Sequence, residues 1–118
     1  MIRIPFTLAD VGLREIEGMI SVEDEFVVLD LSDKLLGLVD LDEKTIKIEA
    51  TALQEIRLQR RPFKDRLILV PKKRDLLDAV PGKHATEVRL RIWKTSRRQT
   101  EQLLVTIEAL RLRGAGPA

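Results

Sequence analysis

Few residues in this chain could carry out catalysis. There is no cysteine and no tyrosine, and the single histidine, His84, follows Pro-Gly-Lys with no nucleophile beside it. One of the three serines, Ser96, is better explained as a helix cap. Acidic residues gather at 23–25 and 40–43, where hairpin turns are expected and aspartate is common. We therefore expect no enzymatic activity, no cofactor and no metal site.

Charge is distributed unevenly along the 118 residues. Residues 1–50 contain 12 acidic and 5 basic side chains, whereas residues 51–118 contain 7 acidic and 16 basic ones. The two parts therefore carry −7 and +9, which together give the net charge of +2. Such an asymmetry can produce one acidic and one basic side, which favours an anionic partner. The alternative is that acidic strands pair beside basic ones and the charges cancel.

One group of basic residues is predicted on the face of a sheet. If the last three predicted strands are neighbours, alternation places Arg57, Arg89 and Arg91 on the solvent face, with Trp93 beside them. A basic face with an aromatic ring could bind anionic lipid head groups or single-stranded nucleic acid. The alternatives are that the arginines only cover the sheet and that Trp93 packs against the first helical turn.

A second basic group lies at the start of the predicted helix. Arg97 and Arg98 occupy the first turn, where the helix dipole disfavours cations by a few tenths of a kcal/mol each. Together with Lys94 and the free backbone N–H groups they could bind an anion or an acidic patch on a partner. The alternative is two solvated arginines at small cost.

Alternation of apolar and polar residues predicts short strands throughout the first 93 residues. Their ranges are 1–8, 14–20, 25–31, 35–41, 44–49, 53–60, 66–70 and 87–93. We expect turns at 21–24, 42–43 and 61–65, a bulge at Gly37 and a single helical turn at 75–79. Pro5 places the first strand at an edge or a bulge because proline cannot donate to a ladder.

Residues 96–114 are the one segment with helical spacing. Apolar side chains recur along one stripe at Leu103, Leu104, Ile107 and Leu110. Ser96 and Gln99 match a capping box, and Gly114 suits the position after the helix. Because this stripe can be buried only against a sheet, we expect the helix to close the open end of a barrel.

This order of elements resembles the pleckstrin-homology-like (PH-like) superfold. The segments 53–60, 66–70, 87–93 and 96–113 are similar to the second half of small bacterial members. The resemblance implies a mainly β protein of about seven antiparallel strands in two roughly orthogonal sheets, a partly open barrel capped by a C-terminal helix. We expect one domain, 1–113, and a flexible tail, 114–118.

The predicted function is that of a non-enzymatic adaptor, which binds a protein partner or a second copy of itself through exposed edge strands. The alternative is binding of anionic lipid or nucleic acid through the basic sheet face. The inositol phosphate ligand of lipid-binding PH domains is not implied, because Glu23, Asp24 and Glu25 on the first hairpin would repel it. The lack of cysteine and of a long apolar run predicts a cytoplasmic protein that does not span a membrane.

Overall fold

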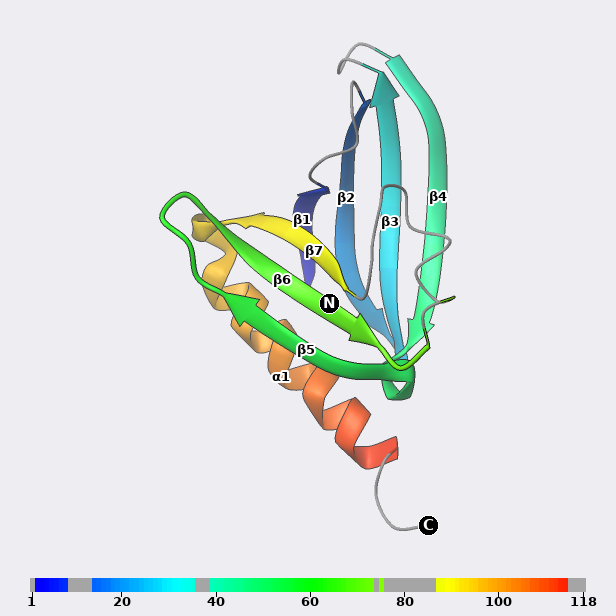
Figure 1. Ribbon diagram of the computed structural model, residues 1–118, viewed down its shortest axis with the longest axis vertical. Coiled ribbons are helices and arrows are strands. Elements are labelled where there is room, and N and C mark those ends of the chain that lie inside the picture. The colour runs from blue at the N-terminus through cyan, green and yellow to red at the C-terminus, as the bar shows by residue number, and fades with distance from the viewer. Residues whose placement is uncertain (1, 9–13, 36–38, 74, 76–86, 115–118) are drawn as a thin grey trace.

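The computed structural model describes residues 2–8, 14–35, 39–73, 75 and 87–114. These residues form a mainly β protein that ends in an α-helix (Figure 1). The strands are β1 (Arg3–Leu8), β2 (Arg14–Glu23), β3 (Phe26–Leu35), β4 (Val39–Glu49), β5 (Leu53–Gln59), β6 (Lys64–Pro71) and β7 (Val88–Trp93). The 3₁₀ segment η1 (Ala50–Ala52) precedes β5, and η3 (Lys94–Ser96) leads into helix α1 (Arg97–Gly114). The mainly β prediction with a C-terminal helix is confirmed.

The strands form one open antiparallel sheet in the order β4-β3-β2-β1-β7-β6-β5. We expected two sheets, and the reason for the difference is the junction between β1 and β7. Two residue pairs, Thr7 with Arg91 and Leu8 with Leu90, connect these strands and make the hydrogen-bonded ladder continuous. Beyond this junction the halves diverge, and Figure 1 shows β5, β6 and β7 running across the direction of β2, β3 and β4.

The prediction that Pro5 places the first strand at an edge or a bulge is wrong, because β1 lies between β2 and β7 and its pairing with β2 shows no register shift. Pairing between β1 and β7 involves only Thr7 and Leu8 on the β1 side. Pro5 lies beyond this paired segment, so its missing N–H interrupts no described ladder with β7. A proline is therefore tolerated in an internal strand.

Two predicted turns fall elsewhere. β2 continues to Glu23 and pairs with Phe26, so the first hairpin turns at Asp24 and Glu25 rather than at 21–24. Asp24 has φ 53, a left-handed conformation that aspartate tolerates well. No turn occurs at 42–43, since β4 runs through these residues in register with β3. Pairing with a long neighbouring strand outweighs the low strand propensity of acidic residues.

Three further expectations depend on segments that the structure describes only partly. The expected strand 35–41 covers the end of β3 and the start of β4, while Gly37 lies outside the described residues. The expected helical turn at 75–79 is outside them except for Asp75. Helix α1 includes Gly114, and the expected tail beyond it, 115–118, is not described.

The hydrophobic core lies on one face of the sheet, the core face, and α1 contacts β5, η1 and β2 there. In β1 the pattern is regular: Ile4, Phe6 and Leu8 are buried in the core, and the alternate residues point to the opposite, outer face. Leu103 and Ile107 of the predicted helical stripe are fully buried, and Leu104 packs against the core. Figure 1 shows α1 running alongside β5.

A close contact between β1 and β2 requires glycine at position 18. Gly18 is paired with Phe6 on one side and Leu31 on the other. A Cβ atom at Gly18 would lie 2.6 Å from Cζ of Phe6 and 2.5 Å from the backbone oxygen of Asp30. Both distances are shorter than a carbon atom allows, so any side chain here forces the ring and a neighbouring strand to move.

We predict that Gly18→Ala lowers the free energy of unfolding by about 2 kcal/mol, the cost of overpacking a well-packed core. Urea unfolding followed by circular dichroism measures this change. Gln59→Ala, on an exposed strand position, is the control and should stay within about 0.5 kcal/mol of the wild type. A Gly18→Ala protein as stable as this control would contradict the steric argument.

Candidate functional site

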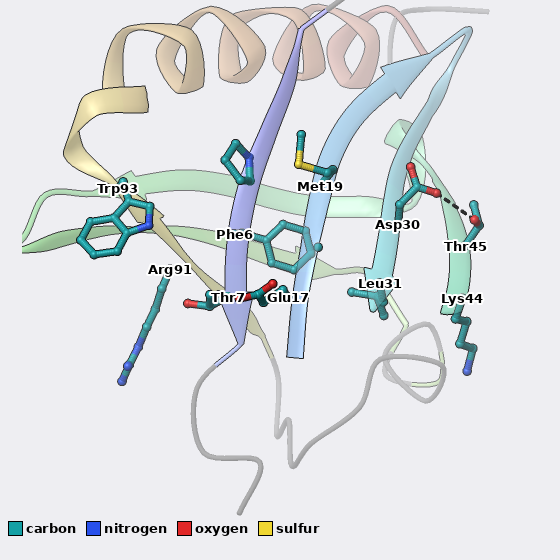
Figure 2. A pocket seen from close by; sticks show the side chains of 12 residues that line it. Phe6, Thr7, Glu17, Met19, Asp30, Leu31, Lys44, Thr45, Arg91 and Trp93 are labelled. Atoms are coloured by element: carbon teal, nitrogen blue, oxygen red, sulfur yellow. Dashed lines mark hydrogen bonds between the residues drawn. The ribbon is translucent and has the colours of Figure 1, made fainter. Parts of the chain in front are cut away.

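The predicted basic residues share the outer face of the sheet. Arg57 and Arg89 flank Ile68 of β6 in register, and Arg91 and Trp93 follow along β7 (Figure 2). Alternation therefore predicted the side of the sheet correctly. Two further cations were missed: Arg66 pairs with Arg91, and Lys64 pairs with Trp93. Only the register between β6 and β7 shows that they belong to the same surface.

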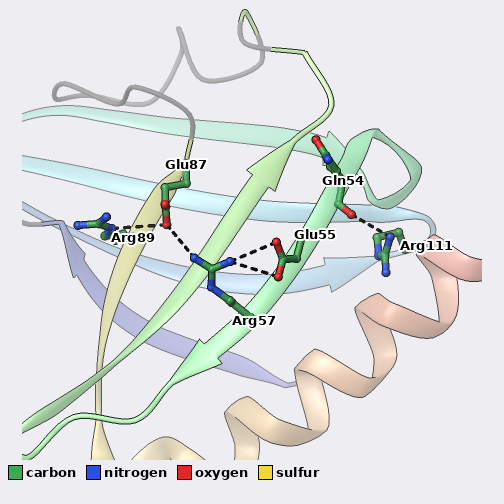
Figure 3. Close-up of polar contacts among 6 residues, drawn as sticks. All are labelled: Gln54, Glu55, Arg57, Glu87, Arg89 and Arg111. Atoms are coloured by element: carbon green, nitrogen blue, oxygen red, sulfur yellow. Dashed lines mark hydrogen bonds and ion pairs between the residues drawn. The ribbon is translucent and has the colours of Figure 1, made fainter.

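Two of the three arginines predicted on this face are neutralised by carboxylates. Arg57 lies 3.2 Å from Glu55 and 3.7 Å from Glu87, and Arg89 lies 3.5 Å from Glu87 (Figure 3). Ile68 between the two arginines is only 2% exposed, which fits the interpretation that their aliphatic stems cover the sheet. Arg57 and Arg89 therefore contribute no net positive charge to this part of the surface.

Positive charge is concentrated instead at one end of the molecule. We call the basic end the β5–β6 hairpin, the last residues of β7 and the beginning of α1, residues 60–66 and 91–101. Its eight cations face only two carboxylates, Asp65 and Glu101, and are Arg60, Arg61, Lys64, Arg66, Arg91, Lys94, Arg97 and Arg98. Figure 1 shows the hairpin and the start of α1 at the same end. This region carries six net positive charges in a protein whose total is +2.

Two aromatic side chains are exposed at the basic end. Phe63, in the turn of the β5–β6 hairpin, is 85% exposed, and Trp93 is 56% exposed. The ammonium group of Lys64 lies 4.2 Å from the centre of the Trp93 ring, a cation–π contact. Trp93 is thus largely open to solvent, and the contact described for its ring is with a strand residue rather than with the first helical turn.

An ion pair between a buried carboxylate and a half-buried arginine connects the start of α1 to β6. Arg97 donates two hydrogen bonds, of 2.6 and 2.7 Å, to the carboxylate of Asp65, which is fully buried. The backbone N–H of Arg61 donates a third, of 3.2 Å. The bonds from Arg97 hold the pKa of the Asp65 carboxyl below its ordinary value, against the opposite effect of burial. This partner explains why a cation is tolerated in the first turn of the helix.

Most cations of the basic end are not engaged in salt bridges with described residues. Arg60 forms a salt bridge with Glu101 at 2.8 Å, and Arg97 forms one with Asp65 at 2.6 Å. Within the described residues, no salt bridge involves the other six cations, which are Arg61, Lys64, Arg66, Arg91, Lys94 and Arg98. Four of the seven residues singled out from the sequence lie together at the basic end: Arg91, Trp93, Lys94 and Arg98. The three cations form no salt bridge with a described residue, and Trp93 is 56% exposed.

Other kinds of site find little support in the described part of the chain. It contains no group of three or more histidine, cysteine or carboxylate side chains placed to hold a metal ion. His84 lies outside the described residues. No helix within them is both long and apolar enough to cross a membrane.

Because the Asp65–Arg97 pair requires an ionised carboxylate, we predict that its contribution to the free energy of unfolding depends on pH. A carboxyl whose pKa is lowered by folding stabilises the protein above its ordinary pKa of about 4, and this contribution is lost as the pH falls through the lowered value. Asp65→Asn should therefore lower the free energy of unfolding by about 2 kcal/mol at pH 7, because the charged hydrogen bonds with Arg97 are lost. The difference should shrink at increasingly acid pH.

Urea unfolding at several pH values measures this difference. Glu101→Gln removes an exposed ion pair at the same end and is the matched control, with an expected loss of less than about 1 kcal/mol. An Asp65→Asn deficit that stayed constant down to pH 2 would show that the carboxylate is not the source of the stability.

Comparison with known proteins leaves the chain without an assigned relative, since no family model, no curated protein and no solved structure matches it.

Proposed function

We propose that the protein is a non-enzymatic binding domain with PH-like architecture. The strand order, in which β1 separates β2–β4 from β5–β7, supports this proposal together with the C-terminal helix. The crossing of the two halves in Figure 1 is also what two roughly orthogonal layers joined at a corner would give. The helix then closes one opening of a partial barrel with Leu103 and Ile107.

We further propose that this domain binds an anionic membrane surface through the basic end. The observation that carries the proposal is the presence of six net positive charges around an exposed phenylalanine at the tip of a hairpin. Each lysine or arginine near an anionic leaflet contributes about 1 kcal/mol of attraction. An aromatic ring at the water–lipid interface adds apolar contact that salt does not screen.

A membrane fits these residues better than nucleic acid does. Phe63 projects from a turn and follows an exposed proline, Pro62, which suits shallow insertion between head groups. Single-stranded nucleic acid is typically bound on a series of aromatic rings, on which successive bases stack. Here one side of the Trp93 ring is already in contact with Lys64. A cytoplasmic location is part of the proposal, because the cytoplasmic leaflet is the anionic one.

The first test is co-sedimentation with vesicles of phosphatidylcholine containing about one-third phosphatidylserine. We expect binding at low ionic strength that weakens steeply with added salt, since screening acts over about 10 Å at 0.1 M. The double variant Arg61→Glu/Lys94→Glu should bind at least tenfold more weakly. The control, Lys72→Glu/Lys73→Glu, changes the net charge equally but lies at the opposite end of β6, and should lose less than threefold.

Phe63 allows the apolar contribution to be tested separately. Phe63→Ala should reduce binding several-fold and leave a stronger dependence on salt, because only the electrostatic attraction remains. Leu112→Ala, which removes an exposed apolar side chain from α1, should have no effect. If the protein bound a single-stranded oligonucleotide but not the vesicles, the membrane proposal would be overturned in favour of nucleic acid. If the two double charge variants lost vesicle affinity equally, binding would depend on net charge alone and not on the basic end.

Binding of a protein partner, which the sequence favoured, is the second candidate function. The observation that favours it is a groove on the outer face, described below. Self-association through edge strands stays a prediction.

A further inference from the structure

A groove of about 570 Å³ crosses the outer face of the sheet beside the basic end. Its principal residues form one row across five strands, from Trp93 of β7 through Pro5, Met19 and Asp30 to Thr45 of β4. Figure 2 shows Trp93 and Arg91 at one side of this row, and Asp30 and Thr45 at the other. Its volume is typical of a ligand site.

The groove begins where β7 stops pairing with β1. Arg91 is still paired with Thr7, but Trp93 lies two residues further along β7, where no pair with β1 remains. Trp93 lines the groove, whereas Lys64, whose ammonium group lies 4.2 Å from the centre of the Trp93 ring, does not. Because Trp93 is 56% exposed, it can contact a ligand in the groove.

The two ends of the groove have opposite chemistry. At the β7 end, Arg91 forms no salt bridge with a described residue, and its cross-strand neighbour is a second cation, Arg66. At the other end, the Asp30 carboxylate accepts hydrogen bonds of 2.8 Å from Thr45 and 3.4 Å from Arg3. Each of its oxygens keeps a further lone pair, and its side chain is 38% exposed. The contact with Arg3 is a salt bridge, and Lys44 of β4 also lines this side of the groove, so Asp30 offers hydrogen-bond acceptor sites rather than an uncompensated negative charge. The groove thus offers a cationic donor at one end and acceptor sites at the other.

Between these ends the floor is largely apolar. Pro5 and Met19 are paired neighbours on β1 and β2 and occupy the middle of the row. A flexible methionine adapts to apolar side chains of different shape. The middle of the groove therefore suits small or aliphatic groups and provides no strong charge from these two residues.

We propose that this groove binds an extended peptide segment of a partner protein, with an acidic side chain at Arg91 and Trp93 and a basic side chain at Asp30. Three strand spacings separate β7 from β3, or about 14 Å. An extended chain advances about 3.3 Å per residue, so the acidic and basic residues should be about four positions apart. Apolar side chains between them would lie over Pro5 and Met19. The proposal does not depend on membrane binding.

A peptide matches this arrangement better than a polyanion does. A nucleic acid strand along the groove would bring a phosphate against the carboxylate of Asp30, which lines it. A peptide can instead place charges of opposite sign at the two ends and apolar groups between them.

The test is selection from a displayed library of random nonapeptides on the full-length chain, followed by fluorescence polarisation with the synthetic consensus peptide. We expect a consensus with an acidic and a basic residue about four positions apart. Arg91→Glu should weaken binding of this peptide at least tenfold, and a new selection on this variant should replace the acidic residue by a basic one. Asp30→Asn should relax the preference for the basic residue and leave the acidic one.

Two variants separate this site from the rest of the surface. Arg89→Glu makes the same charge change two residues away on the same outer face, and should alter peptide affinity less than twofold because Arg89 does not line the groove. Met19→Lys should abolish peptide binding while vesicle binding persists. A consensus without the acidic residue, or equal losses for Arg91→Glu and Arg89→Glu, would overturn the proposal.

Discussion

The architecture depends on the short junction between β1 and β7. Two residue pairs join the halves of the sheet, and one of them, Leu8 with Leu90, is buried in the core. A longer junction would hold the halves in one continuous twist, and no junction would leave two separate sheets. With two pairs the strands diverge at once, so that Pro5 and Trp93 border an opening on the outer face. The helix covers the opposite, apolar side of the sheet, which could not remain exposed to water.

The concentration of cations at one end has a cost that the Asp65–Arg97 pair partly offsets. Eight positive side chains within two short segments repel one another, and Arg97 in addition faces the positive end of the helix dipole. The buried carboxylate of Asp65 supplies an attractive partner, and its two charged hydrogen bonds with Arg97 are stronger than those between neutral groups. It also links the first residue of α1 to β6. One carboxylate therefore offsets part of the repulsion and joins the helix to the sheet.

The sequence contained the local part of this organisation but not the long-range part. Alternation was enough to place Arg57, Arg89, Arg91 and Trp93 on one face, because side-chain direction depends only on parity along a strand. It could not show that Glu87 neutralises both Arg57 and Arg89, or that Asp65 binds Arg97 across 32 positions, since these contacts depend on which strands become neighbours. The position of Pro5 was misjudged for the same reason. A turn was predicted at 42–43 from the local preference of acidic residues, but pairing with β3 outweighs that preference and these residues lie within β4.

The two proposed surfaces meet at Trp93, and their meeting has a thermodynamic consequence. Lys64 of the basic end lies over the Trp93 ring, and Trp93 also lines the groove. An acidic side chain bound at Arg91 would introduce a negative charge within a Debye length of the cations that attract an anionic membrane. Partner binding would then weaken membrane binding, and by linkage the membrane would weaken partner binding by the same factor. The acidic side chain of the partner and the anionic membrane are both attracted to the same cations. The two ligands would therefore compete for this surface, and the competition would require no change in fold.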